Sequence, residues 1–102
     1  MRHLYARQQW DEPMKQTWKQ LQQLPNVGPA TAEDLVRLGV RSIENLAHED
    51  PVKLYRRLSE LDGIEQDPCV QDVFAAAIHA ARTGSDIPWW HWSRERKAAA
   101  PA

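Results

Sequence analysis

Residues 24–32 form the stretch of this chain that is best suited to bind an anion. Leu24 precedes Pro25, which disfavours a helix before it, and Pro29 suits the first position of a new helix. The opening N–H groups of a helix have no intrahelical acceptor and lie at the positive end of its dipole. The backbone here therefore predicts a turn and a helix start that could hold a phosphate.

Aromatic and basic residues are interleaved near the C-terminal end, a pattern that can stack bases and neutralise the backbone of single-stranded nucleic acid. The cluster consists of Trp89, Trp90, Trp92, Arg94, Arg96 and Lys97. Two other interpretations stay open. Trp89 and Trp92 could fold back and complete the core, or the cluster could bind a protein, because exposed aromatic groups mark interfaces.

No catalytic or metal-binding set can be assembled with any specificity. The histidines are too scattered for a metal site, and they are His3, His48, His79 and His91. Cys69 has no evident partner, although the first turn of an expected helix could lower its pKa. We therefore expect a protein that is not an enzyme, with no cofactor and no small-molecule substrate.

Length and charge restrict the class of protein further. The 102 residues suffice for one domain with a modest core, and the net charge of -1 argues against a protein held to nucleic acid by bulk charge alone. Acidic residues outnumber basic ones over residues 42–86, so an anionic ligand should prefer the two ends. With one cysteine, no signal sequence and no long apolar run, we expect a cytoplasmic protein that does not contact membranes.

Apolar residues at helical spacing, together with capping residues and prolines, predict an all-α fold of five helices. The expected helices lie within residues 11–24, 29–38, 43–48, 51–62 and 68–83. We expect one domain over residues 12–93, after a flexible arm over residues 1–11 that could dock through Tyr5 or Trp10. Residues 94–102 are expected to be a disordered tail, rich in basic residues and alanine.

An internal repeat relates the first helix pair to the last. A displacement of 37 positions aligns Trp18 with Tyr55, Leu21 with Leu58, Leu24 with Leu61, and Val27 with Ile64. After one inserted residue, the alignment continues with Ala32 on Val70, Leu35 on Val73 and Val36 on Phe74. Because the matches lie on both sides of both turns, they predict a pseudo-duplication of two helix-turn-helix units. Leu61 is expected on the apolar face of its helix, with Leu54 and Leu58.

The first unit resembles a helix-hairpin-helix motif, in which a short Gly-apolar-Gly turn joins two antiparallel helices, and residues 25–29 fit that pattern. Across residues 21–92 the order of pieces is similar to the small pathogenicity-locus family. The pieces that carry this resemblance are Gly39-Val40-Arg41-Ser42, Asp50-Pro51, Leu54-Tyr55, Asp67-Pro68-Cys69-Val70, Val73-Phe74 and Trp89-Trp90-His91-Trp92. The resemblance implies a five-helix (helix-hairpin-helix)2, SAM-like domain with one degenerate hairpin and a role at DNA.

Helix-hairpin-helix proteins that bind DNA hold a phosphate with the backbone of the hairpin, so the resemblance implies a contact that does not read sequence. The residues carried over to this role are Val27, Gly28, Ala30 and Thr31, with Lys19, Arg37 and Arg41 as flanking contacts. Asn26 replaces the usual first glycine, and Glu33 and Asp34 bring negative charge close to the site. The second turn, residues 62–67, is surrounded by carboxylates and is expected to be purely structural.

These observations predict a small, non-enzymatic module that binds DNA weakly and without sequence preference through the first hairpin. The alternative is a protein interaction module that binds another protein or a second copy of itself. Such a module would use a helix face or the tryptophan-rich C-terminal segment.

Overall fold

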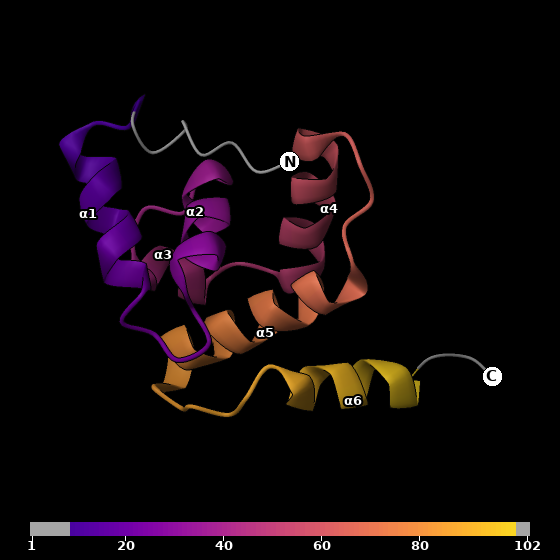
Figure 1. Cartoon of the computed structure of the whole chain (residues 1–102). Helices are drawn as coiled ribbons and strands as arrows, with labels where there is room; N and C mark the ends of the chain where they lie inside the picture. Colours follow the sequence, from indigo (N-terminus) through magenta and orange to yellow (C-terminus); the bar gives the residue numbers. More distant parts are fainter. Residues whose placement is uncertain (1–8, 100–102) are drawn as a thin grey trace.

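The computed structural model describes residues 9–99, which form six α-helices and no strand (Figure 1). The helices are α1 (Glu12–Leu21), α2 (Pro29–Arg37), α3 (Ile43–Ala47), α4 (Pro51–Asp62), α5 (Pro68–Thr83) and α6 (Trp90–Ala99). The all-α fold is confirmed, with one helix more than the five expected. Predictions about residues 1–8 and 100–102, including a docked Tyr5, lie outside the described residues.

Capping side chains set the starts of four helices. Each accepts a hydrogen bond from a backbone N–H of the first turn, and they are Asp11 of α1, Ser42 of α3, Asp50 of α4 and Asp67 of α5. The end of α1 differs from the sequence prediction, because the helix stops at Leu21. Beyond it the N–H of Leu24 donates to the carbonyl of Leu21 at 3.1 Å, which makes a tighter turn before Pro25.

The apolar stripes of α1 to α5 meet in one core. Its largest fully buried apolar side chains are Phe74, Leu21, Leu35, Leu46, Leu54, Leu58, Val36 and Val40. α1 packs on α2, while α5 lies between α6 on one side and α3 and α4 on the other (Figure 1). Trp10 is 8% exposed and belongs to the core, so the expected flexible arm does not extend to this residue.

The internal repeat holds at Leu21 and Leu58 but fails at Leu61 and in the turns. Leu21 and Leu58 are both fully buried, as their alignment predicts. In the α1–α2 turn (residues 22–28) Val27 is 6% exposed, whereas Ile64 in the α4–α5 turn (residues 63–67) is 59% exposed. Leu61 is 53% exposed, so its expected place on the buried face of α4 is wrong.

The expected disordered tail is wrong for residues 94–99, which belong to α6. This helix is held against α5 by an ion pair between Arg96 and Asp72, a residue 24 positions away in sequence. Trp92 also packs on α5, with its ring centroid 5.2 Å from that of His79. A short helix gains its stability from such tertiary contacts, which sequence spacing alone does not reveal.

Candidate functional site

The α1–α2 turn depends on Asn26, which has a φ of 68° and is the one non-glycine residue with positive φ among residues 9–99. Asparagine tolerates this left-handed conformation better than most residues, which explains how it replaces a glycine. Its side chain also does what glycine cannot. Nδ2 donates to the carbonyl of Ile87 at 2.9 Å, and Oδ1 accepts from the N–H of Trp89 at 3.2 Å. Asn26 thus joins this turn to the connection between α5 and α6.

Two further contacts brace the turn from inside. The indole Nε1 of Trp18 donates to the carbonyl of Pro29 at 3.0 Å, which ties α1 to the first residue of α2. Val27 fills the interior, and its N–H donates to the carbonyl of Leu24 at 3.2 Å. Because this bond engages the N–H of Val27 within the turn, this group does not point outward as a phosphate donor, in contrast to the sequence prediction.

The start of α2 remains open to an approaching ligand. Gly28 is its N-cap, with φ -93° and ψ -175°, and it provides no side-chain acceptor for the first turn. Gly28, Pro29 and Ala30 are exposed, and Thr31 is half-buried. A Cβ atom built on Gly28 would meet nothing within 4 Å, so the space beside this residue is open. The predicted donors Gly28, Ala30 and Thr31 therefore lie together at the start of α2, where Gly28 and Ala30 are exposed and Ala30 already takes part in a further interaction within the fold.

The acidic residues after this start do not face solvent. Glu33 is 2% exposed and Asp34 is 3% exposed, and Asp34 accepts a hydrogen bond from Arg37 Nη1 at 3.3 Å. Arg37 also bonds to Asp62 at the end of α4. Burial lowers the pKa of the Arg37 guanidinium, but its hydrogen bonds and charge interactions with Asp62 and Asp34 outweigh burial and raise that pKa.

Two of the three predicted flanking bases are directed to internal partners. Arg37 holds the two carboxylates described above, and its side chain is 12% exposed. Arg41 Nη1 donates to the carbonyls of Val36 and Val40 at 3.2 Å each, which satisfies backbone acceptors at the end of α2. Lys19 is exposed and forms no ion pair within residues 9–99. Arg41 is exposed as well, but these two bonds direct its guanidinium toward α2, so Lys19 is the exposed base of the predicted three that has no such internal acceptor in the described part of the chain.

The predicted C-terminal cluster divides into an inward and an outward group. Trp92 and Arg96 contact α5, whereas Trp89 is 37% exposed and Trp90 is 49% exposed. The guanidinium carbon of Arg94 lies 5.7 Å from the centroid of the Trp90 ring, within range of a cation–π contact. Lys97 is also exposed. The outward group is therefore Trp89, Trp90, Arg94 and Lys97.

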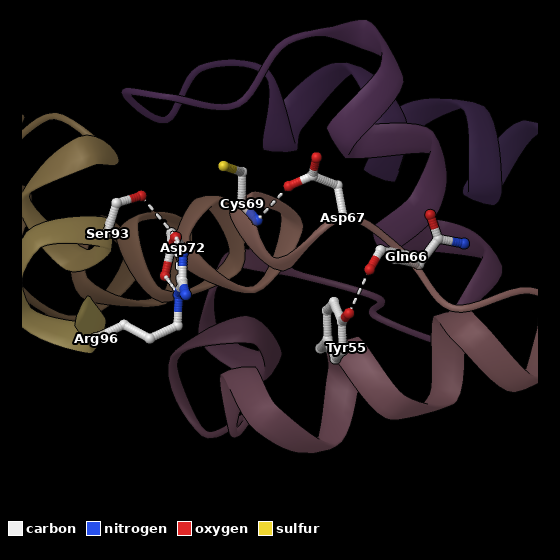
Figure 2. Close-up of polar contacts among 7 residues, drawn as sticks. All are labelled: Tyr55, Gln66, Asp67, Cys69, Asp72, Ser93 and Arg96. Atoms are coloured by element: carbon white, nitrogen blue, oxygen red, sulfur yellow. Dashed lines mark hydrogen bonds and ion pairs between the residues drawn. The ribbon is translucent and has the colours of Figure 1, made fainter. Parts of the chain in front are cut away.

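Sequence reasoning missed the site where α6 docks on α5 (Figure 2). Asp72 is 2% exposed and accepts from Ser93 Oγ at 2.6 Å and from Arg96 Nη2 at 3.0 Å. The hydrogen bonds from Arg96 to this carboxylate are the main reason that the pKa of the guanidinium is raised. A signal was available, because Asp72 interrupts the apolar run of α5 and a buried carboxylate requires a partner.

Cys69 lies near this docking site, and its surroundings raise the pKa of its thiol, whereas the sequence predicted a lower pKa. Figure 2 shows the backbone N–H of Cys69 donating to Asp67 at 2.8 Å. A side-chain hydrogen bond with Asp67 is the main cause that raises the pKa of the Cys69 thiol, and burial raises it further. The suggestion that the helix start lowers this pKa is therefore wrong. Within residues 9–99, no group of three or more potential metal ligands comes together.

Comparisons with known proteins place the chain in a family. A family model named Cdd1 and described as "Pathogenicity locus" matches residues 14–98. "Mitomycin resistance protein McrB" of Streptomyces lavendulae is 40% identical over 74 residues, which cover 72% of this chain and 70% of that protein. No solved structure matches the chain. In the described part of the chain, no helix has the length and apolar character of a membrane span. The chain belongs to the Cdd1 pathogenicity-locus family.

Proposed function

We propose that this protein is a small, non-enzymatic helix-hairpin-helix module that binds the DNA backbone weakly and without sequence preference at the start of α2. One observation carries the proposal. Of the helices α1 to α5, α2 is the one whose N-cap offers no side-chain acceptor to the first turn. A phosphate oxygen would take the place that an aspartate or serine side chain occupies in the other four.

The charges around the turn support a weak contact of this kind. Glu33 and Asp34 are buried, and Lys19 in the last turn of α1 is an exposed cation predicted to flank the site. Because Arg37 and Arg41 have internal partners, few phosphates can be neutralised at this surface. We expect the logarithm of the affinity to fall against the logarithm of salt concentration with a slope of about -1 to -2, the value for one or two phosphates.

A titration of labelled duplex DNA tests the proposal. Two duplexes of unrelated sequence should bind equally, and binding should weaken with added salt along the shallow slope given above. The variant Gly28→Leu should weaken binding, because its side chain would occupy the open space at the start of α2. The backbone at Gly28 is extended and the space is open, so the variant should fold normally.

The matched control is Ala98→Leu, which adds the same side chain at an exposed position of α6. This variant should bind DNA as the natural protein does. Absence of binding at low salt would contradict the proposal, as would a Gly28→Leu variant that binds as tightly as the control.

The α4–α5 turn favours a second candidate function, which is protein–protein interaction. Leu61 and Ile64 are the most exposed large apolar residues of the described chain, at 53% and 59%. Their exposure would be reduced by a partner protein or a second copy of this chain. Sedimentation over a range of concentrations should then reveal a dimer that Leu61→Ser abolishes, whereas a monomer at every concentration would exclude self-association.

The name of the Streptomyces relative suggests a cellular assay for either candidate. If this chain also protects cells from mitomycin, survival should depend on the surface that carries the function. Loss of protection in Gly28→Leu would support the α2 start, and loss in Leu61→Ser would support the α4–α5 turn.

A further inference from the structure

The folded chain brings together two features that are far apart in sequence. Asn26 in the α1–α2 turn binds the backbone of Ile87 and Trp89, which lie 61 and 63 positions away. Trp89 directly precedes α6, so the aromatic start of that helix is fixed beside the turn that leads into α2. The side chain of Asn26 provides both hydrogen bonds, one as donor and one as acceptor.

The tryptophans at this junction face solvent, whereas the others are covered. Trp89 is 37% exposed and Trp90 is 49% exposed, while Trp10 is 8% exposed and Trp18 and Trp92 are half-buried. Neighbouring exposed indole rings are a costly use of apolar surface in water. Such a pair is typical of a surface that binds a ligand.

The charges on this part of α6 favour an anionic ligand, and the aromatic rings beside them favour one with bases that can stack. Arg94 lies over the ring of Trp90, and Lys97 is exposed one turn farther along. Glu95 is the acid on α6, while the third base, Arg96, is already paired with Asp72. Aromatic faces next to cations are the combination that holds bases and backbone of single strands.

We propose that the preferred ligand is DNA in which a duplex adjoins unpaired bases, with the duplex backbone at the start of α2 and the unpaired bases stacked on Trp89 and Trp90. This inference rests on the proposed function of the α1–α2 turn. It adds the class of DNA structure, and it assigns Arg94 to the backbone of the unpaired strand.

Three labelled DNAs test the inference, namely a blunt duplex, the same duplex with a single-stranded overhang, and the overhang strand alone. The overhang duplex should bind about 5- to 150-fold more tightly than the blunt duplex, as expected for stacking of one base. The double variant Trp89→Ala/Trp90→Ala should reduce this preference to about one. Trp89→Phe/Trp90→Phe should largely restore it, because phenylalanine keeps an aromatic face.

The control is Val52→Ala, which removes exposed apolar surface from α4, where Val52 is 38% exposed. It should keep the preference for the overhang. Quenching of tryptophan fluorescence by the overhang strand gives a second measurement, and the double alanine variant should lose it.

The outcomes separate the inference from the function on which it rests. Absence of binding to all three DNAs overturns both. Equal binding of the blunt and overhang duplexes overturns the inference alone, as does an overhang preference that survives in the double alanine variant. Dimer formation that depends on Trp90 and competes with DNA would show that this surface binds a second copy instead.

Discussion

Replacement of Asp72 by alanine should release α6 while α1 to α5 stay folded. Asp72 is 2% exposed on α5 and accepts hydrogen bonds from Ser93 and Arg96 of α6. Ser93 is the one buried residue within α6. The half-buried ring of Trp92 packs against His79, and Asn26 binds the connection that precedes α6. Among these contacts, the Asp72 carboxylate supplies the buried polar bonds between α5 and α6.

The magnitude follows from how deeply each bond is buried. The bond between Ser93 Oγ and the Asp72 carboxylate is short at 2.6 Å and joins two buried groups. A hydrogen bond to a charged group contributes about 1.5–3 kcal/mol. The Arg96 side chain is 31% exposed, so water can solvate its guanidinium when the ion pair with Asp72 is lost. This ion pair therefore adds little to the free energy of docking. We expect Asp72→Ala to weaken docking by about 2–3 kcal/mol.

Hydrogen exchange of backbone amides measures this effect element by element. A loss of about 2–3 kcal/mol corresponds to exchange about 30- to 150-fold faster, and the amides of α6 should show it while those of α5 do not. Glu95→Ala, at an exposed neighbour on α6, is the control and should leave exchange unchanged. The reasoning is refuted if α6 in Asp72→Ala exchanges within about twofold of the natural protein, or if all helices lose protection together.

Other predictions concern the two turns and the start of α5. Asn26→Ala should be less stable than Asn26→Gly by about 1 kcal/mol in urea denaturation, because only alanine is strained at positive φ; equal stabilities would contradict this. Leu58→Ala should lower the free energy of unfolding by about 2–5 kcal/mol, and Leu61→Ala, at an exposed position, should lower it by less than about 1 kcal/mol. Similar losses in the two variants would contradict the difference in burial between these residues. The backbone N–H of Cys69 lowers the pKa of Asp67, so the stabilisation by this carboxylate should be present above the pKa of an unfolded aspartate. It should be lost in thermal melts as the pH falls through the lower folded pKa, and Asp67→Asn should not show this loss. Because Asp67 and burial raise the pKa of Cys69, alkylation at neutral pH should be slower than for a free thiol and faster in Asp67→Asn; equal rates would count against this account.

The helix starts were predictable because their causes act within one turn of the chain. Asp50 and Asp67 each cap a helix whose first residue is proline, and α4 and α5 begin where that pattern predicts. The buried stripe of α5 was predictable for the same reason, since helical spacing determines which residues share a face. The motifs that resemble the family lie at these helix starts, within the helices, and in connections such as residues 39–42.

The exposure of the two turns was not predictable from their aligned residues. Val27 and Ile64 occupy equivalent positions of the repeat, but one is buried and the other is exposed. Alignment identifies equivalent residues, whereas burial depends on which distant part of the chain packs against them. Val27 belongs to the core cluster, and the neighbouring Asn26 binds the α5–α6 connection.

The sequence by itself determined where five helices begin, which of their faces are apolar, and that the start of α2 has no capping side chain. The tertiary structure decided which charged side chains remain accessible to a ligand and which distant parts of the chain come into contact. It pairs Arg37 with Asp34 and Asp62, and it places Trp89 against Asn26. The physical reason is the sequence separation over which each interaction acts. Caps and helical periodicity act over a few residues, whereas long-range ion pairs and hydrogen bonds join residues that only folding brings together.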